Sequence, residues 1–225
     1  MKILVVEDEM DLSHSICEYL TNEQFVCEKA FNYTSALEKI SLYEYACIIL
    51  DITLPDGNGM DILAELKKTE KLDGVLIISS KNALEDKVKG LKGGADDYLT
   101  KPFYLPEMAA RVSAIIRRKS FDGKNRIEIE NLVIDLNEKL VKAGDMKIEL
   151  TKKEYDLLIY FISNKNRVIT KNAIAEHLWG DSMDMAGSYD FIYTHIKNLR
   201  KKLMAAGTRD FIQSIYGMGY KFTIS

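Results

Sequence analysis

The first half of the chain alternates short apolar runs with segments of helical periodicity. The runs with β-strand character are KILVV, FVCEKA, ACIIL, GVLIIS and DDYLT. Between and after them, segments such as SALEKISLY and EMAARVSAIIRR have the apolar spacing of amphipathic helices. This alternation predicts a doubly wound α/β domain, in which five parallel strands form a sheet with helices on both faces.

The second half has a different order of elements. Strand-like alternation appears in IEIENLVIDL, KLVKAG and KIEL. Helical patterns follow in KKEYDLLIYFISN, KNAIAEHLW and SYDFIYTHIKNLRKKLMAA, and a hairpin-like pair surrounds FIQSIYGMGYKFTI. This order predicts an α+β domain. The polar stretch KSFDGKNR lacks periodicity, so we expect domains at residues 1–118 and 127–225 joined by a linker at residues 119–126.

Composition agrees with two folded domains. The chain has 225 residues, of which 47% are apolar and 3 are Pro, so each half can bury a core. No apolar run approaches the roughly 18 residues that span a bilayer, and Met1 leads directly into an apolar run instead of a signal peptide. We therefore expect a soluble cytoplasmic protein without a membrane partner. The 3 Cys residues lack CxxC spacing, which argues against a disulfide framework and a zinc site.

The charge changes sign along the chain. Residues 1–118 contain 14 basic and 20 acidic side chains, a charge of −6, whereas residues 119–225 contain 17 and 14, a charge of +3. The stretch from Phe191 to Arg209 has five basic residues and no acidic one. Such a stretch is either a nucleic-acid-binding surface or the solvated face of a helix, and charge alone favours neither.

Polar side chains directly follow four of the five apolar runs of the first half. Glu7 and Asp8 follow the first run, and Asp51 follows the third. Ser79 and Lys101 end or follow the fourth and fifth runs. In open α/β sheets, ligands bind beyond the carboxyl ends of the strands. We therefore expect three acids, a hydroxyl and an ammonium at one edge of the sheet.

This set of residues has a specific chemistry. Three close carboxylates raise one another's pKa unless a cation lies among them. Oxygen ligands without Cys or His favour Mg²⁺ over zinc or copper. The Lys101 ammonium can hold the oxygens of a phosphoryl group, and the Ser79 hydroxyl can donate to another of them. The sequence therefore predicts a Mg²⁺ site that binds phosphate.

These residues, with LDITLPDGNGMDIL, GADDYLTKPF and the spacing between them, resemble the receiver domain of two-component response regulators over residues 1–118. The resemblance implies that Asp51 accepts a phosphoryl group in line from a sensor histidine kinase or a small phosphodonor. It also implies that Lys101 contacts the phosphate. The Mg²⁺ ligands that it implies are Asp8, Asp51, the Thr53 backbone carbonyl and, through water, Glu7. Ser79 and Tyr98 match the switch pair of the family.

A Mg²⁺-dependent phosphohydrolase with an aspartyl nucleophile is the alternative from another class. Such enzymes generally carry a second Asp two residues after the nucleophile as acid and base, and here that position is Thr53. A GxxxxGK[ST] loop for nucleotide phosphates is also missing from the sequence. We therefore expect a protein that catalyses only its own phosphoryl transfer and dephosphorylation.

The basic stretch of the second half lies in an amphipathic helical pattern. Thr194, Lys197 and Lys201 lie opposite an apolar stripe, and Tyr193 and Asn198 flank them. A helix fits the major groove of DNA, where Lys neutralises phosphates and Asn can make a bidentate pair with adenine. The pattern alone is more typical of a solvated amphipathic helix.

The segments ELTKKEYDLLIYFISNKNRVITKNAIAEHLW, HIKNLRKKL and IQSIYGMGYKF resemble the winged-helix DNA-binding domain of OmpR/PhoB-like transcription regulators over residues 127–225. The resemblance implies that a helix from about Ser188 to Ala206, which contains Arg200, enters the major groove of double-stranded DNA. It implies that the hairpin turn at Gly217, next to Tyr216, forms a wing near the minor groove.

Three positions depart from the family. Most members carry Arg in place of Asn198, and often in place of Asp190 and Tyr216, so the base preference and the wing contact are open to test. The loop with Met183 and Met185 precedes the helix, at the place where the family can touch RNA polymerase. The whole sequence predicts a phosphorylation-controlled transcription regulator. The alternative is a regulator of the same fold that works unphosphorylated.

Family resemblance also implies a receiver homodimer on phosphorylation. The dimer would use the helix after the turn at Lys81 and Asn82, the fifth strand and the last receiver helix. The residues that it would pair across a two-fold axis are Glu107, Arg111 and Arg118 with Lys87, Asp97 and Asp96. Each exposed pair contributes only about 0 to 1 kcal/mol.

Overall fold

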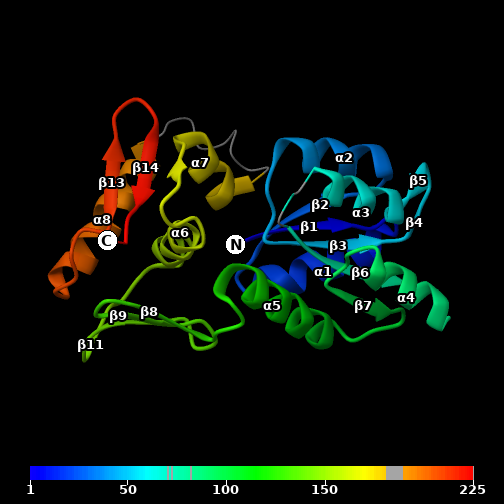
Figure 1. The fold of residues 1–225 in the computed structure, drawn as a ribbon, viewed down its shortest axis with the longest axis horizontal. Helices are drawn as coiled ribbons and strands as arrows, with labels where there is room; N and C mark the ends of the chain where they lie inside the picture. The colour runs from blue at the N-terminus through cyan, green and yellow to red at the C-terminus, as the bar shows by residue number, and fades with distance from the viewer. Residues whose placement is uncertain (70, 72, 82, 181–189, 225) are drawn as a thin grey trace. The chain divides into compact units, whose positions relative to one another are not determined.

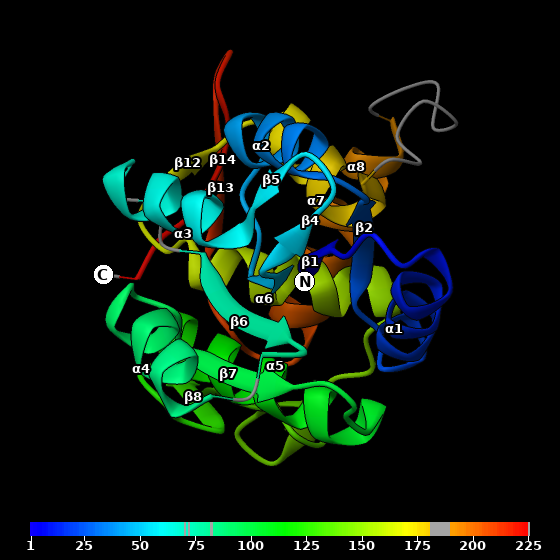
Figure 2. The same ribbon diagram turned by 90° about the vertical axis from the view of Figure 1, so that its right-hand side faces the viewer.

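The computed structural model describes residues 1–69, 71, 73–81, 83–180 and 190–224. The chain divides into two compact units, one of residues 2–123 and the other of residue 1 with residues 124–225. Each unit has its own sheets and helices (Figures 1 and 2). None of the described helices is both long and apolar enough to cross a membrane.

The first unit is built around a five-stranded parallel sheet of strand order β2-β1-β3-β6-β7. Its strands are β1 (Lys2–Val6), β2 (Val26–Ala30), β3 (Cys47–Asp51), β6 (Gly74–Ser79) and β7 (Asp97–Thr100). The helices on one face are α2 (Tyr33–Leu42) and α3 (Gly59–Lys68), those on the other are α1 (Met10–Asn22) and α5 (Leu105–Phe121), and α4 (Leu84–Lys92) lies beside β7 (Figure 1). The predicted doubly wound α/β fold is confirmed.

The central strands are fully covered. Every residue of β3 and β6 is buried, as expected for strands that helices cover on both faces. The strands run parallel, so their carboxyl ends lie at one edge of the sheet. Asp51 and Ser79 are the last residues of these two strands, so both lie at that edge.

The last helix of the first unit is longer than the sequence suggested. α5 continues through Lys119 to Phe121, and the next strand already begins at Arg126. The ends of the predicted linker at residues 119–126 are therefore taken up by α5 and β8, and the two units divide within it, between residues 123 and 124. Phe121 is buried and extends the apolar face of the helix, and Asp122, at φ 52°, takes the left-handed conformation that ends it.

A short hairpin that the pattern did not predict follows β3. Its strands are β4 (Thr53–Leu54) and β5 (Gly57–Asn58), which pair antiparallel. Two-residue strands are too short to produce a recognisable alternation. The hairpin lies immediately after Asp51, so its geometry bears on the candidate site.

The second unit begins with a four-stranded antiparallel sheet of order β11-β10-β9-β8. Its strands are β8 (Arg126–Ile129), β9 (Leu132–Asp135), β10 (Leu140–Ala143) and β11 (Met146–Lys147). The helices that follow are α6 (Lys152–Ser163), α7 (Lys171–Trp179) and α8 (Asp190–Ala205). The three-stranded sheet β12-β14-β13 consists of β12 (Val168–Ile169), β13 (Ile212–Ile215) and β14 (Gly219–Phe222). This arrangement is the predicted winged-helix type of α+β domain.

Several predicted features fall outside the described residues. They are the start of the basic helix at Ser188, the loop with Met183 and Met185, and the turn residue Asn82. Within the described part, α8 runs from Asp190 to Ala205, close to the end expected at Ala206. Its four core-facing residues, Ile192, Ile196, Leu199 and Leu203, are buried as the apolar stripe predicted.

Candidate functional site

Three carboxylates meet at the carboxyl edge of the parallel sheet. Glu7 directly follows β1 and is fully buried, Asp51 ends β3 and is 5% exposed, and Asp8 is exposed. Each of the three offers an oxygen within 4.8 Å of the others. The register that pairs Val6 with Leu50 places the ends of β1 and β3 side by side. The sheet itself therefore brings these acids together.

Lys101 connects two of the three carboxylates. Its Nζ atom lies 2.6 Å from Asp51 Oδ2 and donates to Glu7 Oε1 at 2.8 Å. The backbone N–H of Lys101 donates to the carbonyl of Ser79 at 2.8 Å, which fixes the residue beside β6. One ammonium balances one of three negative charges, so the cluster keeps an excess of negative charge that a cation can neutralise.

Burial and ion pairing shift the pKa values of Lys101 and Glu7 in opposite directions. Burial would lower the pKa of Lys101, but its hydrogen bonds and charge interactions with Asp51 and Glu7 outweigh burial and raise the pKa above the usual value. Burial raises the pKa of Glu7 above its usual value, although the Lys101 ammonium opposes this effect. Lys101 therefore stays charged at neutral pH.

The loop after Asp51 passes close to the carboxylate. The Thr53 N–H donates to Asp51 Oδ1 at 2.9 Å, so both carboxylate oxygens of Asp51 are held. Gly59 lies so near that a Cβ atom there would be 2.1 Å from the Asp51 carbonyl oxygen. Only glycine permits this approach. The first residue of the β4–β5 hairpin and the first residue of α3 thus both lie directly against Asp51.

The Ser79 and Tyr98 side chains are both hydrogen-bonded to the backbone of Lys81. The buried Ser79 hydroxyl accepts a hydrogen bond from the Lys81 N–H at 3.1 Å, and the Tyr98 hydroxyl donates to the Lys81 carbonyl at 2.8 Å. Tyr98 is only 9% exposed. The sequence indicated the two residues but not Lys81, whose contacts are made by backbone atoms and leave no mark in the side-chain pattern.

The donor set suits a hard divalent cation. Carboxylate oxygens without nitrogen or sulfur ligands favour Mg²⁺. Asp8 is exposed at the mouth of the cluster, while the buried Glu7 and Asp51 form its floor. A cation among them would also offset both the mutual repulsion of the carboxylates and the cost of burying their charges. The residues present therefore fit a Mg²⁺ site.

The basic helix of the second unit presents polar side chains opposite its buried stripe. Thr194, Lys197, Asn198 and Lys201 are exposed on α8, and Tyr193 is 42% exposed beside them. This face borders a hollow of about 580 Å³ that β13 and β14 also line. The helix thus offers hydrogen-bond donors and positive charge beside a concave surface.

Arg200 is placed differently from the other basic residues. It is half-buried, and its guanidinium forms a two-point ion pair with Asp210, with Nε 3.0 Å from Oδ1. Its pKa is raised by this pairing. Arg200 was among the predicted DNA contacts, but in this structure its Nε and Nη2 atoms donate to Asp210.

The wing is formed by β13, β14 and the turn between them. Tyr216 is fully exposed at this turn, next to Gly217, and Met218 is 59% exposed. The tip carries no charged side chain. Its chemistry is therefore apolar and hydroxylic, in contrast to the positive charge of α8.

Three residues of the predicted dimer surface form ion pairs within the chain. Arg111 contacts Asp97 and Glu107, each at 2.8 Å. Arg118 donates to the Asp96 carbonyl at 3.4 Å. The Arg111–Asp97 pair was predicted across a two-fold axis, so its formation inside one copy means that a dimer would have to exchange or share it. The Asp96 carboxylate, predicted to pair with Arg118 of a second copy, lies 3.3 Å from Lys119 Nζ in this chain.

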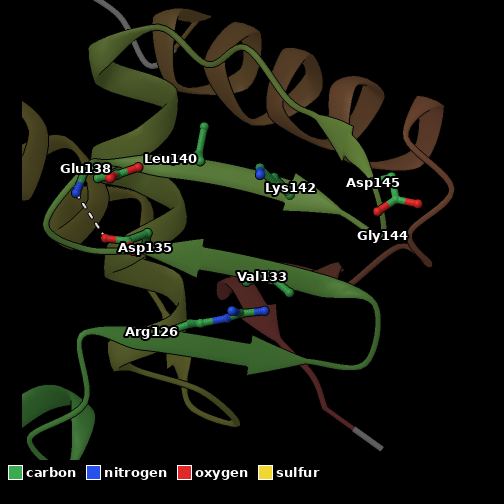
Figure 3. A pocket seen from close by; sticks show the side chains of 8 residues that line it. All are labelled: Arg126, Val133, Asp135, Glu138, Leu140, Lys142, Gly144 and Asp145. Atoms are coloured by element: carbon green, nitrogen blue, oxygen red, sulfur yellow. Dashed lines mark hydrogen bonds between the residues drawn. The ribbon is translucent and has the colours of Figure 1, made fainter.

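A second hollow lies on the four-stranded sheet. It has a volume of about 360 Å³, and Figure 3 shows Arg126 and Lys142 on two of its strands, with Asp135 towards the left and Asp145 towards the right. The Glu138 N–H donates to Asp135 Oδ1 at 3.0 Å. None of the predicted site residues lines it, and its charges are of both signs.

Comparisons with known proteins match both units. The response regulator receiver domain family matches residues 3–113, and the family of C-terminal domains of transcriptional regulatory proteins matches residues 145–222. The transcriptional regulatory protein CiaR of Streptococcus pneumoniae is 37% identical over 98% of this chain and 97% of its own length. The response regulator ArlR of Staphylococcus aureus is 36% identical over 97% of this chain and 98% of its own.

The receiver domain of the Francisella response regulator 1452 is similar in structure. It has a TM-score of 0.51 and 33% identity, covering 52% of this chain and 97% of its own. Together with the relatives that match almost end to end, this likeness accounts for both units of the chain. The protein belongs to the OmpR/PhoB-like family of response regulators, the phosphorylation-dependent transcriptional regulators of two-component systems.

Proposed function

We propose that Asp51 is the phosphoacceptor and that the phosphoryl group comes from a sensor histidine kinase or a small phosphodonor. The observation that carries this proposal is the position of Asp51 at the end of a central strand, bonded to the Lys101 ammonium at 2.6 Å beside two further carboxylates. An Asp51 oxygen attacks phosphorus in line. The new O–P bond forms as the P–N bond of phosphohistidine, or the P–O bond of acetyl phosphate, breaks, and the leaving group keeps the bonding electrons.

The surrounding residues bind and orient the phosphoryl group. Asp8, Asp51 and the Thr53 carbonyl would hold Mg²⁺ directly, and Glu7 would act through water. Bound Mg²⁺ supplies charge neutralisation at the phosphoryl oxygens. Lys101, already between Glu7 and Asp51, can turn its ammonium to one phosphoryl oxygen without leaving the site.

The switch pair would respond to the new phosphate. The Ser79 hydroxyl accepts from the Lys81 N–H, and it can turn towards a phosphoryl oxygen and donate its own O–H to it, which would weaken the bond to Lys81. The turn at Lys81 would then shift, and the Tyr98 hydroxyl is bonded to the carbonyl of the same residue. A movement at the phosphate would therefore reach β7, α4 and α5, whose predicted dimer residues are Lys87, Asp96, Asp97, Glu107, Arg111 and Arg118.

The second unit would bind double-stranded DNA through α8. Lys197 and Lys201 are exposed and suited to phosphates, whereas Asn198 is suited to the N6 and N7 edge of adenine. Thr194 and Tyr193 would add contacts beside them, and the wing tip at Tyr216 and Gly217 would lie near the minor groove. We assign Arg200 a supporting role because Asp210 pairs with it.

Phos-tag electrophoresis after acetyl phosphate treatment tests the phosphoacceptor. We expect Mg²⁺-dependent labelling of the wild type, none of Asp51→Ala, and nearly none of Asp8→Ala, because the latter loses a metal ligand. Asp61→Ala, which removes an exposed acid from the first turn of α3, is the matched control and should label normally. Retained Mg²⁺-dependent labelling of Asp51→Ala would refute the assignment, and a wild type that cannot be labelled would favour a phosphorylation-independent regulator.

A further inference from the structure

The tip of the β4–β5 hairpin is tied to a helix that lies elsewhere in the chain. Asp56 Oδ1 accepts a hydrogen bond from the Tyr33 N–H at 2.6 Å. Asp56 Oδ2 accepts from the Thr34 N–H at 3.0 Å and from the Thr34 hydroxyl at 2.8 Å. Tyr33 and Thr34 are the first residues of α2, and three hydrogen bonds to one carboxylate make this a defined attachment.

The attachment supplies what the helix end requires. The first N–H groups of a helix lack partners within it, and negative charge is favourable there. The Asn32 side chain accepts from the Ser35 N–H at 2.8 Å, which leaves the N–H groups of Tyr33 and Thr34 for Asp56. Desolvation opposes ionisation, but these hydrogen bonds outweigh it and lower the pKa of Asp56 below its usual value.

Packing supports the same attachment. Gly57, next to Asp56, lies against the Tyr33 ring so closely that a Cβ atom there would be 2.6 Å from Tyr33 Cγ. This contact involves carbon atoms and does not depend on the carboxylate. The hairpin tip is therefore held to α2 both by hydrogen bonds and by van der Waals contact.

The hairpin carries this restraint to the phosphoacceptor. Thr53 pairs with Asn58, and Leu54 pairs with Gly57, so the tip and the base of the hairpin form one short ladder. At the base, the Thr53 N–H donates to Asp51 Oδ1 at 2.9 Å. A hairpin that is free at its tip could tilt about the base and move the Thr53 backbone relative to the carboxylate.

We propose that Asp56 is a positioning residue for Mg²⁺ binding: by clamping the hairpin to α2, it holds the Thr53 backbone where it completes the carboxylate site. This inference rests on the proposed function of Asp51, Asp8 and the Thr53 carbonyl. Asp56 touches neither the phosphoryl group nor the metal. Loss of outer-shell partners weakens metal binding by about 10- to 100-fold in other proteins.

Calorimetric titration of the full chain with Mg²⁺ tests the proposal without relying on phosphorylation. We expect Asp56→Ala to weaken Mg²⁺ binding about tenfold, the lower end of the range for outer-shell partners. Asp56→Asn, which keeps one acceptor oxygen, should lie between Asp56→Ala and the wild type. Thr34→Val removes only the hydroxyl donor and should have a smaller effect in the same direction. Asp61→Ala is the control for loss of an acid and should bind as the wild type does.

The outcomes separate this proposal from the one on which it rests. If Asp56→Ala binds Mg²⁺ as the wild type does, Asp56 only stabilises the fold and the proposal is overturned, whatever its melting temperature. If Asp56→Ala does not fold, Asp56→Asn and Thr34→Val take its place. Weaker Mg²⁺ binding than in the wild type then supports the proposal, and wild-type binding in both variants overturns it. A wild type without measurable Mg²⁺ binding, or an Asp51→Ala variant that still becomes labelled, would instead contradict the proposed function.

Discussion

Asn198 and Lys201 lie on the same exposed face of α8 but differ in what they can recognise. The ammonium of Lys201 is a point charge that suits any phosphate, so it favours all DNA sequences alike. The amide of Asn198 can donate to N7 and accept from N6 only at adenine, in a bidentate pair worth about 1–3 kcal/mol against the wrong base. Lys201 should therefore set the affinity, and Asn198 should set the sequence preference.

A selection from randomised DNA sites tests this division of roles. Asn198→Arg should change the selected consensus at one position of each half-site from A·T towards G·C, because Arg suits guanine. Lys201→Ala should keep the consensus, weaken binding to all sites and reduce the slope of log affinity against log salt by roughly one. An unchanged consensus for Asn198→Arg together with an altered one for Lys201→Ala would reverse the assignment.

At the level of residues, the sequence predicted those side chains whose position follows from strand order. Glu7 and Lys101 each follow a strand and Asp51 ends one, so their meeting at one edge could be anticipated. The attachment of Asp56 to α2 could not, because its partners lie 22 and 23 residues away at the start of that helix. The pairing of Arg200 with Asp210 was missed for the same reason, since sequence spacing does not show which charges meet in space.

Helix α6 is joined to α8 through its first turn. Thr151 and Glu154 form a capping box, in which the Thr151 N–H donates to Glu154 Oε2 at 2.8 Å. The same oxygen lies 2.6 Å from Lys202 Nζ of α8. Burial would raise the pKa of Glu154, but Lys202 and the hydrogen bonds at Thr151 outweigh it and lower the pKa. The ion pair thus connects α8 to the first turn of α6.

Removal of Lys202 should destabilise the second unit in a pH-dependent way. The folded-state pKa of Glu154 lies below its ordinary value of 4.5. The stabilisation that the ion pair gives the folded state is therefore fully present above pH 4.5 and is lost as the pH falls below it. Lys202→Met should cost about 1 kcal/mol at neutral pH, the lower end for an unpaired buried group, since half-exposed Lys202 is partly screened. The difference in stability between Lys202→Met and the wild type should vanish in acid.

Denaturation followed by the fluorescence of Trp179, the only Trp of the chain, measures this difference between pH 3 and 7. These pH limits bracket the ordinary carboxyl pKa of about 4. Lys201→Met, one position earlier on an exposed part of α8, is the matched control and should change stability by less than about 0.5 kcal/mol at every pH. A cost for Lys202→Met that stays constant down to pH 3 would show that lost packing, not the ion pair, is responsible.

At the level of elements, long periodic segments were predictable and boundaries were not. The apolar stripe of α8 identified its buried face because four residues repeat over three turns. The end of α5 was placed too early because Lys119 and Ser120 look like linker residues, whereas Phe121 behind them packs into the core. The β4–β5 hairpin escaped notice because its strands have two residues each and are held by contacts outside the hairpin.

The whole molecule combines a negatively charged half with a positively charged one. The charge of −6 over residues 1–118 matches a carboxylate site for a cation, and the charge of +3 over residues 119–225 matches a surface for DNA phosphates. Phosphorylation can regulate DNA binding only if it favours a state of the chain that binds DNA better. A receiver dimer that brings two α8 helices to neighbouring half-sites would meet this condition.

The DNA affinity of the full chain with and without acetyl phosphate tests this account most directly. The probe is a site selected from randomised DNA with the wild-type protein, and binding is followed by fluorescence anisotropy at fixed salt. We predict that acetyl phosphate with Mg²⁺ tightens wild-type binding by about 5- to 150-fold, the usual range of coupling between sites, and leaves Asp51→Ala unchanged. Equal wild-type affinities with and without the phosphodonor, or the same gain in Asp51→Ala, would contradict the claim that phosphorylation of Asp51 controls DNA binding.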